Sequence, residues 1–374
     1  LVGSEMCIRD SFINNGDKTF TESREKYFEK TTLFSMGSDL ADVDNDGDLD
    51  LFVADMEPHE HTRMKSHGFE LPLEFYLMQQ EILNGKQFSR NMFYLLNDDG
   101  TFSEIAELAG VSRTDWSWAT LFAEFDNDGW KDLFISKGTK REFNDRDYAQ
   151  QLFDSDDIHK SRDKPNAMQL IDSMPTVLLG NYIFRNKEGA TFENSSNAWG
   201  LTQKASSQGA AYADLDNDGY LDLIVNNTDT VAFIYKNRGK TLLKNNYLQI
   251  ELRGSSSNIY GIGTKVTLYD SAHRQYQEMA TARGYQSTVE PRMHFGLGQT
   301  KLIDSLKVSW PDGSVQVLKN IRANQVLQID YKAAKKAGNS SEKTDSPKLF
   351  TQTKAPLFTH PVSYTHPEPT RREG

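Results

Sequence analysis

Short runs of apolar residues recur along the chain, separated by turn-forming and acidic residues. Three of them have the composition of buried strands, at residues 51–53, 133–135 and 223–225. Upstream of each run lies a Gly-containing turn that ends in Thr-Phe, which is typical of a hairpin between short strands. From that Phe to the acidic segment before the run, the interval is 22 residues in every copy: Phe20 to Asp42, Phe102 to Glu124 and Phe192 to Asp214. This constant interval predicts one repeated structural unit.

Short strands and turns at a fixed register are typical of β-propeller blades. We therefore expect an all-β fold, with a partial β-propeller of about three blades at residues 12–236. Two longer segments, residues 55–90 and 138–176, interrupt the repeat. Residues 71–85 carry a helical stripe of apolar residues, Leu71, Phe75, Met78 and Ile82. Such insertions either form a binding face or only cap the neighbouring blades.

The acidic segments share one arrangement of carboxylates. Counted from the first acidic residue, carboxylates stand at positions 1, 3, 5 and 9, and a glycine stands at position 6. Loop 1 supplies Asp42, Asp44, Asp46 and Asp50, with Asp48 at position 7. Loop 2 supplies Glu124, Asp126, Asp128 and Asp132, with Trp130 at position 7. Loop 3 supplies Asp214, Asp216, Asp218 and Asp222, with Tyr220 at position 7.

This spacing is that of an oxygen cage for a cation. Calcium takes six to eight oxygen ligands, and alternate side chains plus the backbone carbonyl at position 7 can supply most of them. An Asn-Asp-Gly turn alone needs one acidic residue, whereas four carboxylates within nine residues repel one another unless a cation neutralises them. Oxygen-only ligands favour calcium over zinc or copper, and magnesium dehydrates reluctantly. The sequence therefore predicts about three calcium ions, one in each loop.

Histidines in the first insertion offer a second, weaker metal hypothesis. His59, His61 and His67 lie close together with Glu60. Imidazole ligands suit transition metals. No flanking sequence pattern indicates a framework that would hold these side chains around a metal. We therefore favour the interpretation that they are exposed histidines in a loop.

The C-terminal third has a different pattern. Residues 246–331 alternate apolar and polar residues, as at 247–252, 264–269 and 306–310, with a strong turn at Pro311-Asp312-Gly313. This predicts a separate, small β-sandwich. Residues 332–348 have the composition of a flexible linker.

Composition narrows the function classes. The net charge of −11 argues against nucleic acid as a partner. No apolar stretch is long enough for a transmembrane segment. The single cysteine, Cys7, cannot form an internal disulfide. Residues 1–11 and 361–374 fit neither the repeat nor the linker and resemble translated adapter ends, so we expect a truncated fragment whose leader is lost.

The loops and their Gly-Thr-Phe turns resemble FG-GAP/VCBS repeats. Residues 260–266, 284–287, 294–298 and 310–313 resemble an ASPIC/UnbV domain. Together they are similar to the cartilage-acidic-protein-like family, of the Bacteroidota type. The resemblance implies secretion and a seven-bladed propeller, of which this chain holds about three blades. It also implies that residues 349–360 are the start of a second propeller.

The leading functional hypothesis is a secreted or cell-surface calcium-binding repeat protein that mediates adhesion by binding an extracellular protein or glycan. The chain carries no nucleophile elbow, phosphate loop or zinc-protease motif, so we expect no enzyme. Two alternatives stay open: a calcium-dependent polysaccharide-active enzyme, and an inert scaffold of a surface assembly.

Overall fold

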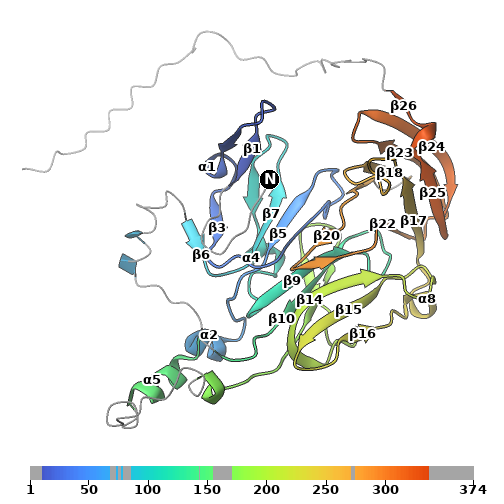
Figure 1. The fold of residues 1–374 in the computed structure, drawn as a ribbon. Coiled ribbons are helices and arrows are strands. Elements are labelled where there is room, and N and C mark those ends of the chain that lie inside the picture. Colours follow the sequence, from blue (N-terminus) through green and yellow to red (C-terminus); the bar gives the residue numbers. More distant parts are fainter. Residues whose placement is uncertain are drawn as a thin grey trace, which may run out of the picture. The chain divides into compact units, whose positions relative to one another are not determined.

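The computed structural model describes residues 11–67, 73–74, 77–78, 86–142, 144–154, 171–270 and 274–336 (Figure 1). Several sequence predictions lie outside these residues: most of the helical stripe at 71–85, much of the second insertion, nearly all of the terminal segments, and residues 349–360. Within the described residues strands dominate and helices are short, which confirms the all-β prediction.

Three sheets carry the acidic loops. Blade 1 has the order β4 (Ser38–Ala41), β5 (Asp50–Val53), β7 (Met92–Leu96) and β8 (Phe102–Glu104). Blade 2 has the order β9 (Ser117–Ala123), β10 (Asp132–Lys137), β12 (Tyr182–Asn186) and β13 (Phe192–Asn194). Blade 3 has the order β11 (Leu179–Gly180), β14 (Lys204–Ala213), β15 (Asp222–Thr228) and β16 (Phe233–Tyr235).

The blades repeat one antiparallel connection. Each acidic loop joins the first long strand to the second, as β4 to β5, β9 to β10 and β14 to β15. In blades 1 and 2, the Gly-Thr-Phe turn joins the third strand to the fourth. The same turn joins β1 (Phe12–Asn14) to β2 (Phe20–Glu22) in a separate two-stranded sheet. A further small sheet pairs β3 (Lys30–Thr32) with β6 (Lys86–Phe88).

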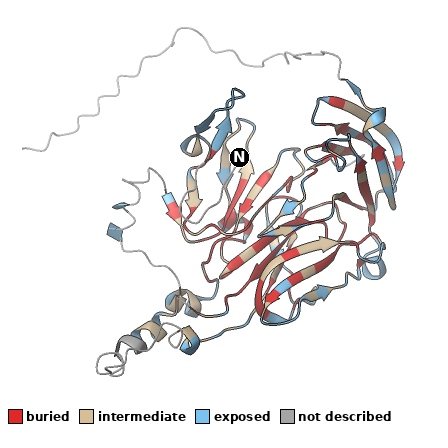
Figure 2. Cartoon of the chain, in the orientation of Figure 1, coloured by how far each residue is buried: buried red, intermediate tan, exposed pale blue. Residues whose placement is uncertain are grey.

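The strands of the blades carry many buried residues (Figure 2), and apolar side chains pack between neighbouring blades. One cluster joins Phe52 and Phe93 of blade 1 to Phe122 and Leu133 of blade 2, and all four are almost fully buried. A second cluster joins blade 2 to blade 3 in the same way. Each such side chain contributes roughly 1.5–3 kcal/mol by leaving water. The blades are therefore held by their shared cores as well as by strand pairing.

The insertions supply two of the helices, α2 (His61–His67) and α5 (Arg146–Asp154). Further helices with described bounds are α1 (Arg24–Tyr27), α4 (Ala106–Ala109), α8 (Gly239–Leu242) and the 3-10 helix η1 (Tyr331–Ala333). His67 Nε2 lies 2.9 Å from Glu142 Oε2, which joins the first insertion to the second. In the part of the chain that the structure describes, no cluster of three metal ligands includes a histidine.

The C-terminal domain is a sandwich of two sheets. One has the order β22 (Arg292–Gly298), β17 (Asn246–Arg253) and β25 (Gln325–Asp330). The other has the order β19 (Arg274–Glu278), β18 (Lys265–Tyr269), β23 (Leu302–Ser309), β24 (Ser314–Arg322) and β26 (Lys335–Lys336). Leu248, Phe295 and Leu306 are fully buried in the core of this domain. Strand β26 continues the sheet past residue 331, where the sequence analysis ends the domain.

A hairpin of this domain contacts all three blades. It consists of β20 (Ala282–Arg283) and β21 (Ser287–Thr288). Arg283 forms an ion pair of 2.8 Å with Asp39 of β4, and Tyr285 packs on Trp118 of β9. Ser287 Oγ accepts the N–H of Ala210 on β14 at 3.2 Å. Blades and C-terminal domain therefore belong to one compact unit, which ends at Lys336.

Candidate metal sites

The three loops adopt one backbone conformation. The asparagine at position 4 has a positive φ in each loop, 61° at Asn45 and 56° at Asn127 and Asn217. The glycine at position 6 also has a positive φ, between 89° and 103°. Asparagine tolerates this left-handed region and glycine enters it at no steric cost. The Asn-Asp-Gly sequence therefore sets the sharp loop that brings alternate carboxylates together.

The aspartate at position 9 closes each loop. One of its oxygens accepts the backbone N–H of loop position 2, and the other accepts an N–H from the end of the third strand. The first contacts are Val43 to Asp50, Phe125 to Asp132 and Leu215 to Asp222, at 3.0–3.1 Å. The second are Leu96 to Asp50, Asn186 to Asp132 and Asn237 to Asp222, at 2.7–3.1 Å. Position 9 therefore has a structural role in all three blades, in addition to its predicted role as a ligand.

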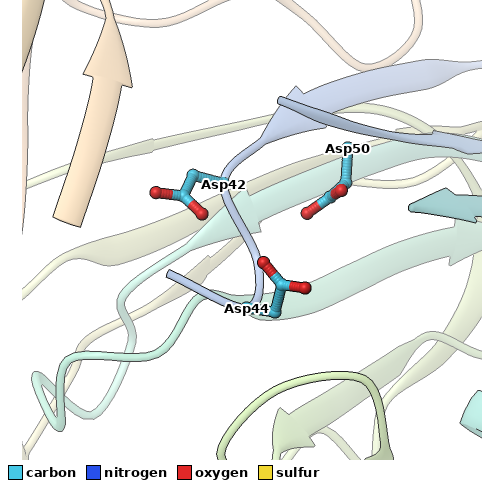
Figure 3. A group of neighbouring side chains, drawn as sticks. All are labelled: Asp42, Asp44 and Asp50. Atoms are coloured by element: carbon cyan, nitrogen blue, oxygen red, sulfur yellow. The ribbon is translucent and has the colours of Figure 1, made fainter. Parts of the chain in front are cut away.

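Each loop gathers three carboxylates whose oxygens lie within 4.8 Å of one another. These are Asp42, Asp44 and Asp50 in loop 1 (Figure 3), Glu124, Asp126 and Asp128 in loop 2, and Asp214, Asp216 and Asp218 in loop 3. The other predicted ligands, Asp46, Asp48, Trp130, Asp132, Tyr220 and Asp222, are not part of these clusters.

Asp132 and Asp222 accept the N–H groups described above, and the N–H of Trp130 donates to Asp128 Oδ1 at 3.0 Å. Asp46 Oδ1 accepts the N–H of Asp48 at 2.9 Å. The side chain of Tyr220 is buried and its hydroxyl donates to the Asn245 carbonyl at 2.8 Å. The aromatic residue at position 7 of loop 3 thus helps to anchor the segment that leads into the C-terminal domain.

Loop 1 contains carboxylates that form no ion pair with a described residue. Two positive groups lie nearby: the charge of Lys131 partly offsets the effect of burial on the pKa of Asp42, and Arg274 donates to the Asp46 carbonyl at 2.9 Å. Asp42 is 2% exposed, and its Oδ1 has no hydrogen-bond partner among the described residues. Burial raises the pKa of Asp42 to about 7 and that of Asp50 to about 8. Burial and the charge of Asp46 also raise the pKa of Asp44. No basic side chain in the described part of the chain forms an ion pair with these three carboxylates. An orphaned buried oxygen beside two carboxylates fits a bound cation.

The carboxylates of loop 2 pair with basic side chains of the protein itself. Lys131 Nζ lies 3.2 Å from Glu124 Oε1, and both side chains are buried. Arg185 of β12 donates from Nε to Asp126 at 2.7 Å and from an Nη to Asp128 at 2.8 Å. Every carboxylate of this cluster therefore contacts a basic side chain of the protein.

In loop 3 the carboxylates are only partly neutralised by basic side chains. Lys236 Nζ lies 2.6 Å from Asp216, and both side chains are exposed. The hydrogen bond from Lys236 lowers the pKa of Asp216. Asp214 accepts the N–H groups of Asp218 and Gly219, each at 2.9 Å. One exposed cation thus partly neutralises this cluster.

The sequence did not lead us to predict these basic side chains, although two fixed positions carry the signal. Strand registers place Leu95, Arg185 and Lys236 at equivalent positions on the third strands. Position 8 of the loops holds Leu49, Lys131 and Leu221. A basic residue at either position predicts a neutralised loop, but only the strand pairing shows that Arg185 faces loop 2.

The loops are joined to one another in order. Asn45 Nδ2 of loop 1 donates to the Gly129 carbonyl of loop 2 at 3.0 Å. Asn127 Nδ2 of loop 2 donates to the Gly219 carbonyl of loop 3 at 2.9 Å. A direct hydrogen bond therefore links each loop to the next.

The C-terminal domain contacts all three loops. The backbone N–H of Tyr276 donates to Asp42 Oδ2 at 3.0 Å. His294 Nε2 lies 2.6 Å from Asn127 Oδ1, and Gln249 Nε2 donates to Asp214 Oδ2 at 2.9 Å. A Cβ at Gly219 would overlap the ring of Tyr247, so this glycine also permits the close approach of the domain. The loops are thus part of the interface between the blades and the C-terminal domain.

Comparisons with known proteins agree with this architecture. Residues 254–336 match the ASPIC and UnbV family model, and residues 176–225, which include loop 3, match the FG-GAP-like repeat model. Cartilage acidic protein 1 of Xenopus tropicalis is 29% identical over 272 residues, which cover 64% of this chain and 41% of that protein. The Homo sapiens protein of the same name is 27% identical over 271 residues, covering 64% and 40%.

A shorter match reaches higher identity: Cartilage acidic protein 1 of Mus musculus is 33% identical over 129 residues, covering 33% of this chain and 19% of that protein. The chain spans about two fifths of the length of the first two relatives. These matches confirm the resemblance to FG-GAP and ASPIC/UnbV sequences and to the cartilage acidic proteins. None of the helices in the described residues has the length and hydrophobicity needed to cross a membrane.

Proposed function

We propose that this chain is part of an extracellular or surface-attached repeat protein whose acidic loops bind calcium. The observation that carries the proposal is the Oδ1 of Asp42, which is buried beside Asp44 and Asp50 and has no partner among the residues that the structure describes. An ionised carboxylate in such a place is costly unless a cation pairs with it. Calcium accepts carboxylate and carbonyl oxygens at flexible geometry.

The proposal assigns different roles to the three loops. Loop 1 is the strongest calcium site because no basic side chain in the described part of the chain forms an ion pair with Asp42, Asp44 or Asp50. Loop 3 binds calcium more weakly, since calcium must displace Lys236 from Asp216. Loop 2 needs no calcium, because Lys131 and Arg185 already neutralise its carboxylates. This is fewer than the three ions that the sequence alone predicts.

Calcium in loop 1 would stabilise two contacts at once. Asp50 ties the loop to the end of β7, and Asp42 accepts an N–H from β19 of the C-terminal domain. The proposed role of the ion is therefore to hold blade 1 and the C-terminal domain in one arrangement. Extracellular calcium modules bind with Kd on the order of 10⁻⁴–10⁻³ M, which suits this role outside the cell. The similarity to proteins named for cartilage supports the same location.

The experiment that tests calcium binding is thermal unfolding of the chain in chelator and in millimolar calcium, with magnesium as the matched control. We expect the unfolding midpoint to rise with calcium and much less with magnesium. An unchanged midpoint would contradict the proposal. Isothermal titration calorimetry then gives the number of ions, expected to be one or two.

For the partner, we propose an extracellular protein or a glycan, with no catalytic role for the loops. In loops 2 and 3 the carboxylates accept N–H groups or pair with basic side chains, and in loop 1 the proposed calcium ion takes up the clustered carboxylates. A glycan array and a polysaccharide-cleavage assay on the same sample separate binding from catalysis. Cleavage products would favour the enzyme alternative, and no signal in either assay would leave a scaffold role.

A further inference from the structure

The outer edge of blade 3 differs from the edges of the other two blades. In blade 1, β8 pairs with β7, and in blade 2, β13 pairs with β12. In blade 3, β16 is the last strand of the sheet, and no strand in the described residues pairs with its outer edge. The residues that follow β16 form the short helix α8, at the place where blades 1 and 2 continue with β8 and β13.

The sequence gives a reason for this difference. In each blade a turn that begins with Asn and contains Gly and Thr follows β7, β12 or β16, at residues 97–101, 186–191 and 237–241. The registers align Asn237 with Asn186. The fourth strands of blades 1 and 2 begin with Phe102 and Phe192. After the corresponding turn, blade 3 has Leu242, which lies in α8 and is 69% exposed.

Phe192 shows what the fourth strand contributes. Its ring lies 5.8 Å from the ring of Phe93 and 6.5 Å from that of Phe122, so it packs into the core between blades 1 and 2. The equivalent place between blades 2 and 3 is a cavity of about 410 Å³. Its lining includes Ile183, which the registers align with Phe93, together with Leu223, Tyr235 and Leu242 of α8. The hydroxyl of Tyr235 is buried and has no partner in the described part of the chain.

A basic residue stands beside this cavity. In blade 2, Lys187 follows the third strand and pairs with Glu193 of the fourth strand at 3.0 Å. Arg238 occupies the position equivalent to Lys187, lines the cavity and is exposed. It forms no ion pair with another described residue. An acidic residue directly after an aromatic one would therefore complete the arrangement seen in blade 2.

We propose that this cavity and the edge of β16 bind an extended segment of a partner protein that contains an aromatic residue followed by a glutamate. The aromatic ring enters the cavity, the main chain adds a strand to β16, and the glutamate pairs with Arg238. Addition of a strand to a sheet edge, with pockets that select alternate side chains, is a general mode of peptide recognition. The proposal goes beyond calcium binding and does not depend on it.

The probe is a labelled peptide with the sequence of residues 190–196, which form the fourth strand of blade 2. Fluorescence anisotropy with the full chain should show saturable binding, and replacing the Phe of the peptide by Ser should weaken it at least about tenfold. The Arg238→Glu variant should weaken binding about fivefold, and a peptide with Lys in place of Glu should restore it. The Arg322→Glu variant, at an exposed arginine of β24, is the matched control and should bind as the wild type does.

Four outcomes would overturn the proposal. The first is the absence of binding at millimolar peptide. The second is equal binding of the Ser-substituted peptide. The third is that the peptide with Lys in place of Glu fails to restore binding to the Arg238→Glu variant. The fourth is self-association of the chain that Arg238→Glu abolishes, because the occupant would then be a second copy and not a different protein.

Discussion

Loop 1 and loop 2 have the same backbone and nearly the same acidic residues, yet their charges are balanced in different ways. In loop 1, burial raises the pKa of Asp42 to about 7, and its Oδ1 has no partner in the described structure. In loop 2, Lys131 and Arg185 contact every carboxylate of the cluster. An acidic loop pattern therefore indicates where positive charge is needed. It does not indicate whether a metal ion or a basic side chain supplies that charge.

The physical reason is the cost of burying charge. An ionised carboxylate removed from water costs several kcal/mol unless it is paired. Loop 1 can meet this requirement with a proton or with a metal ion, whereas loop 2 meets it with side chains that fold into place. The two loops are also joined through Asn45 and Gly129, so changes to either can be compared within one molecule.

The largest effect on the free energy of unfolding is expected from removing a basic side chain from loop 2, so that one of its carboxylates lacks an ion pair with a described residue, as those of loop 1 do. Lys131→Met leaves the fully buried Glu124 without its cation, which should lower the free energy of unfolding by about 3–5 kcal/mol in chelator. Calcium should recover part of this loss by entering loop 2. Chemical denaturation with and without calcium measures both quantities. Lys187→Met, which removes an exposed ion pair, is the control and should change little.

A smaller effect is expected from removing the calcium site of loop 1. At a free calcium concentration 100 times the Kd, binding stabilises the protein by about 2.7 kcal/mol. Asp44→Asn should abolish most of this gain, since it removes one charge from the cluster around the orphaned oxygen. The matched change in loop 2, Asp126→Asn, should leave the calcium-dependent gain intact. An equal loss in both variants would show that the two loops bind calcium alike.

The contacts of loop 1 and loop 2 with the C-terminal domain should respond differently to pH. A backbone N–H holds Asp42, whereas His294 contacts Asn127 of loop 2. Burial, with the charges of Lys131 and Arg292, lowers the pKa of His294 to about 3. Between pH 6.5 and 3 the unfolded chain therefore binds a proton that the folded chain does not.

This histidine should make stability fall as the pH decreases below 6.5, by up to about 1.4 kcal/mol per pH unit. His294→Gln should remove that part of the slope, while His59→Gln, at an exposed position, should not. Urea denaturation between pH 7 and 5 measures the difference between the variants. Parallel slopes in wild type and His294→Gln would contradict the assignment.

The smallest effect is expected in loop 3, where a basic side chain pairs with only one of the clustered carboxylates. Lys236→Met removes the exposed cation from Asp216 and should tighten calcium binding by about two- to fivefold, as measured by calorimetry. Lys240→Met is the matched control on the neighbouring helix and should change the affinity less. If Lys236→Met has no effect, exposed cations do not compete with calcium in these loops.

The sequence by itself determined the local features of this protein. The spacing of carboxylates, the Asn and Gly with positive φ, and the hairpin turns all depend on residues within about ten positions of one another, and steric and hydrogen-bonding rules are sufficient at that range. The alternating pattern after residue 246 likewise indicated a second β domain, and the resemblance to FG-GAP and ASPIC/UnbV sequences is confirmed.

Tertiary structure decided which of these local patterns keep an unpaired charge. Arg185 reaches loop 2 from a strand 59 residues beyond Asp126, and Tyr276 and Gln249 reach loops 1 and 3 from another domain. The open edge of β16 became visible only when three blades could be aligned by their registers. Charge compensation and packing depend on which distant segments meet, and no local pattern specifies that meeting.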